Sequence, residues 1–209
     1  MSVVTPPETA ARRGPGRPRG FDRATALEAA MRVFWKQGFD GTSYPDLMAA
    51  TGMSKPTLYA TFGDKVNLFR EAVVAYSERS TAIYEGALNL PTAREVVETF
   101  LRLCCGFDVV PGEPIVCFLI QGAMTGSADT QELRDELTTV RRQALEKMQA
   151  RFERAQREGE LPATADAGVM AELFAALATG LSVQAASGTP PERLEQVMQL
   201  TIAQWPFTT

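Results

Sequence analysis

The chain has 209 residues, of which 45% are apolar and 22% charged, and its formal net charge is −4. This composition is typical of a folded globular protein and excludes a chain disordered throughout. The sequence contains no histidine, which excludes histidine-based nucleophile pairs, histidine general bases and histidine metal sites. Only three cysteines are present, and the sequence has neither a secretory leader nor a membrane-length apolar run. We therefore expect a cytoplasmic protein without disulfides, membrane contact, metal or cofactor.

Charge is unevenly distributed along the chain. Residues 1–66 hold nine basic and six acidic side chains, whereas residues 67–209 hold twelve basic and nineteen acidic ones. This imbalance indicates that only the first part meets an anionic partner. Residues 1–20 are rich in Pro, Gly and Arg and predict a flexible arm. Arg17 and Arg19 in this arm suit the narrow minor groove of DNA, and the alternative is a solvated tail.

Three helices are predicted after the arm. Apolar residues at spacings of three and four predict a first helix from Asp22 to Gly38. Two short helices follow, opened by Ser43 and Ser54 and separated by a turn at Gly52. Such a pair forms a helix-turn-helix unit, whose second helix enters the major groove of DNA. The side chains expected to be exposed on this second helix are Lys55, Thr57, Tyr59 and Thr61.

The remainder of the chain also predicts helices. Their expected ranges are 64–85, 92–105, 115–125, 129–158, 166–187 and 190–205. The apolar run at 115–125 fits a buried strand equally well by periodicity, but its helical surroundings favour a helix. The helix at 64–85 links the basic part to the body, so it can transmit movement between them.

Many fixed positions occur between Ala26 and Val73. They are Ala29-Ala30, Phe34, Gly38-Phe39, Gly41-Thr42-Ser43, Asp46-Leu47, Ala50-Thr51-Gly52-Met53-Ser54-Lys55-Pro56-Thr57-Leu58-Tyr59, Phe62, Asp64-Lys65 and Leu68-Phe69. With these residues the segment resembles the TetR family of transcriptional regulators. The resemblance implies an all-α fold with a three-helix DNA-binding head at residues 21–66, behind the arm at residues 1–20. A helical ligand-binding and dimerisation body is implied at residues 67–209.

The resemblance also implies which residues meet a double-stranded DNA operator. The recognition helix is about Lys55 to Thr61, and Lys65 occupies a common phosphate contact. Hydroxyl and ammonium groups suit phosphate oxygens and base edges. The expected DNA-binding residues are Arg17, Arg19, Thr42, Ser43, Tyr44, Ser54, Lys55, Pro56, Thr57, Tyr59, Thr61 and Lys65. Packing against the first helix is the alternative for Tyr59, and a solvated charge is the alternative for Lys65.

Two sites are expected in the body. By resemblance, the last two helices pack with those of a second subunit, through Leu173, Leu177, Leu181, Leu194, Val197, Met198, Thr201, Ile202 and Trp205. The alternative is that they only close the core of their own subunit. A pocket for an uncharged or amphipathic small molecule is expected among Phe100, Cys104, Phe107, Cys117, Phe118, Gln121, Met124, Phe152, Phe174 and Leu177, and plain core is the alternative for each.

Cys117 carries a separate hypothesis. It stands near a helix start, where the helix dipole can lower the pKa of a thiol. Some TetR-family regulators sense oxidants or electrophiles through cysteine, and the alternative here is an inert buried thiol. The expected function is a homodimeric repressor, without enzymatic activity, that a small effector releases from a palindromic operator. A thiol-sensing regulator and a ligand-binding adaptor without DNA binding are the alternatives, although the intact Ser54–Tyr59 segment argues against the adaptor.

Overall fold

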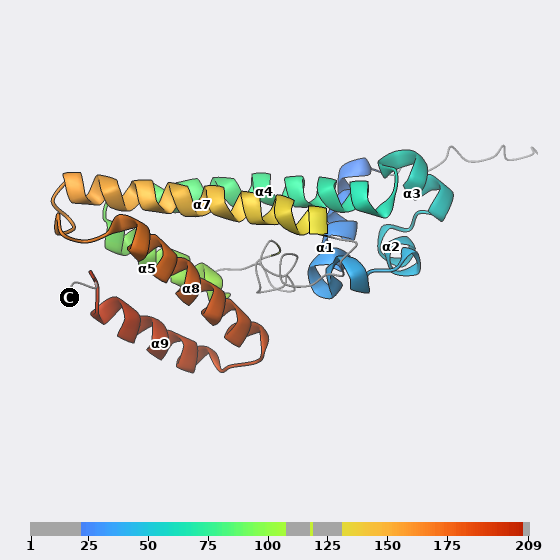
Figure 1. The fold of residues 1–209 in the computed structure, drawn as a ribbon. Helices are drawn as coiled ribbons and strands as arrows, with labels where there is room; N and C mark the ends of the chain where they lie inside the picture. Colours follow the sequence, from blue (N-terminus) through green and yellow to red (C-terminus); the bar gives the residue numbers. More distant parts are fainter. Residues whose placement is uncertain (1–21, 108–117, 119–130, 207–209) are drawn as a thin grey trace, which may run out of the picture.

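A computed structural model describes residues 22–107, Phe118 and residues 131–206. The described elements are all α-helices, which confirms the predicted fold class. They are α1 (Arg23–Gly41), α2 (Tyr44–Thr51), α3 (Lys55–Phe62), α4 (Lys65–Leu88), α5 (Ala93–Cys104), α7 (Gln131–Arg157), α8 (Ala167–Ala186) and α9 (Pro191–Ala203). Helices α1, α2 and α3 form a head at one end, and α4 and α7 run side by side away from it (Figure 1). Helices α5, α8 and α9 complete the body.

The observed helices follow the predicted ranges closely, with one notable difference. α1 continues past its predicted end at Gly38 and reaches Gly41. Gly38 is a kink within this helix, since its φ of 72° and ψ of 174° are not helical. This left-handed φ is readily adopted only by glycine. The predicted arm at 1–20 lies outside the described residues, as does the predicted helix at 115–125 apart from Phe118. The boundary between head and body at residues 66 and 67 stays a prediction.

Local hydrogen bonds explain where the head helices begin. Ser43 and Asp46 form a capping box at α2, in which each side chain bonds the backbone N–H of the other. The bonds from Ser43 lower the pKa of Asp46. At α3 the Ser54 hydroxyl accepts from the Thr57 N–H. Such caps satisfy backbone donors that a helix start leaves without partners.

Apolar side chains form two clusters, one on the head side and one in the body. The head-side cluster draws on α1–α4 and also takes in Leu133 and Leu137 of α7. Phe118 completes it, with ring centroids 5.5 Å from those of Phe69 and Tyr76. The body cluster is formed mainly by α5, α7, α8 and α9. Because α7 and Phe118 pack into the head-side cluster, a movement of α7 in the body can reach the head through these side-chain contacts.

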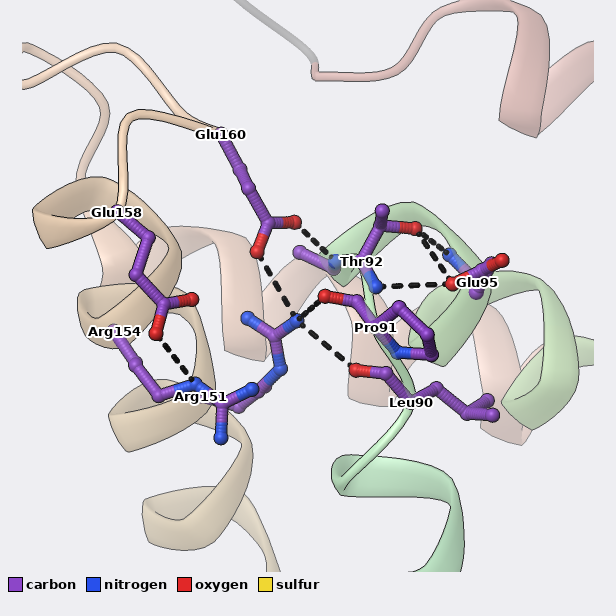
Figure 2. Close-up of polar contacts among 9 residues, drawn as sticks. Leu90, Pro91, Thr92, Glu95, Arg151, Arg154, Glu158 and Glu160 are labelled. Atoms are coloured by element: carbon purple, nitrogen blue, oxygen red, sulfur yellow. Dashed lines mark hydrogen bonds and ion pairs between the residues drawn. The ribbon is translucent and has the colours of Figure 1, made fainter.

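A buried arginine ties together the far end of the body (Figure 2). The Arg151 side chain of α7 is only 2% exposed. Its Nη2 donates to the Glu160 carboxylate at 3.3 Å and to the carbonyls of Leu90 and Pro91 at 3.4 and 3.3 Å. Glu160 also accepts from the backbone N–H of Ala93 at the start of α5. One cation therefore joins the α4–α5 turn, α7 and the loop that follows α7.

Candidate nucleic-acid interface

The outer face of α3 presents the residues expected to meet DNA. Lys55, Pro56 and Tyr59 are exposed and Thr57 is half-buried, whereas Leu58 on the inner side is buried in the head-side cluster. The hydroxyls of Ser54 and Thr57 share a hydrogen bond of 2.7 Å. The face thus combines hydroxyl groups with one exposed ammonium group, the groups that suit phosphate oxygens and base edges.

Two tyrosines join α2 to α3 at this face. The rings of Tyr44 and Tyr59 stack with centroids 5.7 Å apart and an interplanar angle of 20°. The Lys55 ammonium lies 4.6 Å from the centroid of the Tyr44 ring. Burial and then the neighbouring Tyr59 raise the pKa of Tyr44 to about 12. Tyr44 therefore keeps its proton at neutral pH and can act as a hydrogen-bond donor.

The starts of α2 and α3 differ in how well they suit a phosphate. A helix N-terminus attracts anions through its free N–H groups and its dipole. The first turn of α2 already holds the Asp46 carboxylate, which repels a phosphate. The first turn of α3 holds no acidic residue and begins at Lys55. The start of α3 is therefore the better position for a DNA backbone contact.

Two residues expected to touch DNA are engaged inside the head instead. Thr42 is only 2% exposed, and its hydroxyl donates to the Gly38 carbonyl at 2.7 Å. It has almost no surface to offer, so we correct its expected role from DNA contact to bracing of the α1–α2 connection. The Lys65 ammonium donates to the carbonyls of Phe39 and Thr42. Arg17 and Arg19 lie outside the described residues.

The described residues among those expected to line one pocket are divided between the two apolar clusters. Phe152 and Phe174 are buried with their rings in contact, and both contact Trp205. Phe100 packs on Tyr84 in the same cluster, whereas Phe118 belongs to the head-side cluster. Cys104, Phe107 and Leu177 are half-buried, and Cys117, Gln121 and Met124 lie outside the described residues. Phe100, Phe152 and Phe174 are therefore core residues of the body, and the pocket expected among these side chains stays a prediction.

A hollow does occur elsewhere, between α4 and α7. Its volume is about 430 Å³, and it is lined by Val73, Val74, Ser77, Glu78, Thr81 and Val140. This volume is near the lower end of the range of ligand sites, roughly 300–1,000 Å³. The Ser77 hydroxyl is buried without a hydrogen-bond partner. These residues could not be singled out from the sequence, because valines at helical spacing look the same whether they line a hollow or an ordinary packed face.

The surroundings of Cys105 disfavour a reactive thiol. Cys105 is buried, and burial raises the pKa of its thiol. A raised pKa lowers the fraction of reactive thiolate at neutral pH. Cys117, the thiol that carried the sensing hypothesis, lies outside the described residues, so that hypothesis stays a prediction.

The expected dimer residues separate into two groups. Leu181, Leu194, Met198 and Ile202 are buried within their own subunit. Leu177, Val197, Thr201 and Trp205 are half-buried, and Leu173 is exposed.

Exposed apolar residues on α8 and α9 include three that were not among the predicted dimer contacts, Val169, Val183 and Leu200. Val169 of α8 is 64% exposed and Leu200 of α9 is 67% exposed. Leu173 and Val183 continue the exposed stripe along α8. Among the described helices α8 alone is long and apolar enough to span a membrane by length and composition, yet it packs against α5 and α7. An uncovered apolar stripe of this kind marks a surface for protein association.

Known proteins resemble the chain in both sequence and structure. Residues 26–72 match the family model described as "Bacterial regulatory proteins, tetR family", and residues 107–201 match "Tetracyclin repressor-like, C-terminal domain". The HTH-type transcriptional repressor ComR of Escherichia coli is 32% identical over 193 residues, which are 91% of this chain and 92% of ComR. Another relative of E. coli, the HTH-type transcriptional repressor BdcR, is 41% identical over 64 residues, 31% of this chain and 32% of BdcR.

One solved structure is similar over most of the chain. It is a cysteine mutant of the TetR family transcriptional regulator CifR, complexed with 26-base-pair double-strand operator DNA. Its sequence identity is 37% and the TM-score is 0.84, with 91% of this chain and 100% of that chain covered.

Proposed function

The chain belongs to the TetR family of DNA-binding transcriptional regulators, a non-enzymatic class, and we propose that it is a homodimeric repressor with a palindromic operator. In this proposal a small apolar or amphipathic effector releases it from DNA. The observation that carries the DNA-binding part is the outer face of α3, where Lys55 and Tyr59 are exposed beside the stacked Tyr44. The similarity to a regulator solved in complex with operator DNA supports DNA binding by this chain.

The proposed DNA contacts come from α3 and the start of α2. They are Ser43, Tyr44, Ser54, Lys55, Pro56, Thr57, Tyr59 and Thr61, with Arg17 and Arg19 of the arm in the adjacent minor groove. Lys55 at the acid-free start of α3 supplies charge to the backbone, and the tyrosine hydroxyls supply neutral donors. A repressor acting on chromosomal DNA also implies the expected cytoplasmic location.

The proposed dimer forms through the exposed apolar stripe of α8 and α9. Val169, Leu173, Val183 and Leu200 are the residues whose burial would stabilise the pairing of two copies. A dimer supplies two α3 helices for two half-sites about 34–36 Å apart, or further apart on a longer operator. The stripe has no cover within the subunit, which supports a second copy as its occupant.

The proposed effector acts on α4. This helix begins in the head at Lys65 and passes the hollow lined by Val73, Ser77 and Val140. The mainly apolar lining favours an uncharged or amphipathic molecule. An effector that prefers one position of α4 would change operator affinity, typically by ~1–3 kcal/mol of coupling.

Selection from a random duplex library tests the DNA-binding proposal directly. We expect an inverted repeat to be enriched by the full-length dimer, and the affinity for it to fall steeply with salt. Tyr59→Ala and Lys55→Ala should weaken binding, whereas Arg157→Ala, an exposed charge at the end of α7, should not. A folded, dimeric protein that enriches no sequence would refute the proposal and favour the adaptor alternative.

A further inference from the structure

The ammonium of Lys65 lies within the head rather than on its surface. Its Nζ is 2.9 Å from the carbonyl oxygen of Phe39 and 2.9 Å from that of Thr42. It also lies 4.3 Å from the centroid of the Phe39 ring. Burial lowers the pKa of Lys65, and the charge of Asp40 opposes that shift. The side chain is thus held by several groups at once, all of them at the end of α1.

The partners of Lys65 explain why a cation is favourable there. Phe39 lies in the last turn of α1, and Thr42 is the residue at which that helix ends. The last carbonyls of a helix carry the negative end of its dipole, and the Phe39 carbonyl, which accepts from the Thr42 N–H at 3.3 Å, takes the Lys65 ammonium as a second donor. Lys65 reaches them from 23 and 26 residues further along the chain. It therefore closes the end of α1 from the first position of α4.

The same residue is connected to the DNA-facing side of the head. Thr42 directly precedes Ser43, the N-cap of α2. Tyr44, the first residue of α2, follows Ser43 directly, and its ring stacks on that of Tyr59 of α3. The start of α4 is thereby joined to the end of α1, to the α1–α2 connection and, through one aromatic pair, to α3.

We propose that Lys65 is a positioning residue that fixes α2 and α3 relative to α4, and that it is not a phosphate contact. The inference rests on the proposed role of the α3 face in binding DNA. Lys65 sets where that face lies, because it holds the connection from which α2 begins. A displacement of α4 in the body reaches α3 through this residue.

Operator affinity measured over a range of salt concentrations separates positioning from phosphate contact. The measurements use the full-length dimer and the operator selected by the wild type, at a temperature well below the melting point of each variant. We expect Lys65→Met to weaken binding by about tenfold or more, the equivalent of one charged hydrogen bond. The slope of log affinity against log salt should stay that of the wild type. Lys65→Arg should also weaken binding, because a planar guanidinium cannot place its donors where the compact ammonium does.

Lys55→Met is the matched control, since Lys55 is the exposed lysine at the start of α3. If Lys55 contacts phosphate, its loss lowers the salt slope by about 0.9 per contact. Hydrogen exchange of the DNA-free protein adds an independent readout. Lys65→Met should speed exchange across residues 39–42, and Lys55→Met, whose ammonium lies over Tyr44, should leave residues 39–42 unchanged.

Three results would overturn the proposal. In the first, the salt slope falls by about 0.9 per lost contact in Lys65→Met while exchange in the free protein is unchanged, which identifies a phosphate contact. In the second, Lys65→Met melts earlier but binds with wild-type affinity when folded, which leaves a role in stability alone. In the third, Lys65→Arg binds like the wild type, and this variant decides the matter if Lys65→Met does not fold. Failure of the wild type to bind any selected operator would instead refute the proposed function.

Discussion

Replacing Glu160 by alanine should destabilise the protein far more than an ordinary surface substitution. Glu160 is the carboxylate that faces the buried Arg151, and it also accepts the N–H of Ala93 at the start of α5. Its loss leaves a guanidinium that is 2% exposed and bonded only to the carbonyls of Leu90 and Pro91, at 3.4 and 3.3 Å, among the described residues. The Nε and Nη1 atoms of Arg151 are already buried without hydrogen bonds, so they do not offset the loss of the Glu160 carboxylate.

The size of the effect follows from these contacts. Removing one partner of a buried ion pair costs about 3–5 kcal/mol, because it leaves an uncompensated charge. The Glu160 side chain is 23% exposed, so water can reach part of the site, and we expect about 3 kcal/mol, the lower end of the ~3–5 kcal/mol range. For a chain of this size, ~1 kcal/mol shifts the melting temperature by about 2–4 °C, which gives a decrease of about 6–12 °C.

Thermal unfolding at one fixed protein concentration measures this loss. Glu158→Ala is the control, since its partner Arg154 and Glu158 itself are exposed, and such surface pairs contribute about 0–1 kcal/mol. The double variant with Arg151→Met and Glu160→Gln should lose less stability than Glu160→Ala alone, because no buried charge remains. If Glu160→Ala behaved like the control, the buried-charge reasoning would be wrong.

Three further predictions concern the arm, the dimer and the thiol. Removal of residues 1–20 should weaken operator binding and lower the slope of log affinity against log salt. An unchanged slope would refute the minor-groove role of the arm. Leu173→Glu should shift the protein from dimer to monomer in sedimentation experiments, whereas the neighbouring exposed Glu172→Gln should not; a stable Leu173→Glu dimer would place the interface elsewhere. Cys117→Ser should abolish any loss of DNA affinity after mild oxidant, followed with mass spectrometry, and a full response in the variant would exclude this thiol as the sensor.

The elements that could be predicted from sequence are those whose causes are local. Ser43 and Ser54 each bond a backbone N–H only three residues away, so the helix starts they specify are visible in a short window of sequence. The inner and outer faces of α3 follow from helical spacing alone, which buries Leu58 and exposes Tyr59. In the head, therefore, the helix starts and the exposed face of α3 could both be predicted from the sequence.

Contacts between distant segments could not be predicted in this way. Lys65 stands at a helix start and carries a charge, and nothing near it in the sequence indicates that its ammonium closes the end of α1. Arg151 lies in a long charged helix, where an arginine is usually solvated, and only the folded chain brings the α4–α5 turn against it. Both residues donate to backbone carbonyls. Because every residue has a carbonyl, the residue types in the sequence do not show where these contacts form.

For the proposed dimer surface, the sequence indicated α8 and α9 and named Leu173, but it did not distinguish Val169, Val183 and Leu200 as exposed. α8 is apolar on nearly every side, so periodicity does not separate the residues that close its own core from those left uncovered. Leu181 and Val183 differ by two positions, yet the first is buried and the second exposed. Only the packing of α5, α7 and α9 around α8 decides which leucines and valines remain for a partner.

These contacts together describe how α4 is held. Its first residue, Lys65, is fixed to the end of α1, and the turn after its last residue is fixed to Arg151. Between these ends, α4 contacts α7 through the ion pairs of Arg70 with Glu136 and of Glu85 with Lys147, and the Tyr84 hydroxyl donates to the Ala144 carbonyl. The hollow lies between Arg70 and Tyr84 along α4. In the proposed function, an effector bound in this hollow shifts α4 between its two anchored ends, and Lys65 passes that shift to the end of α1.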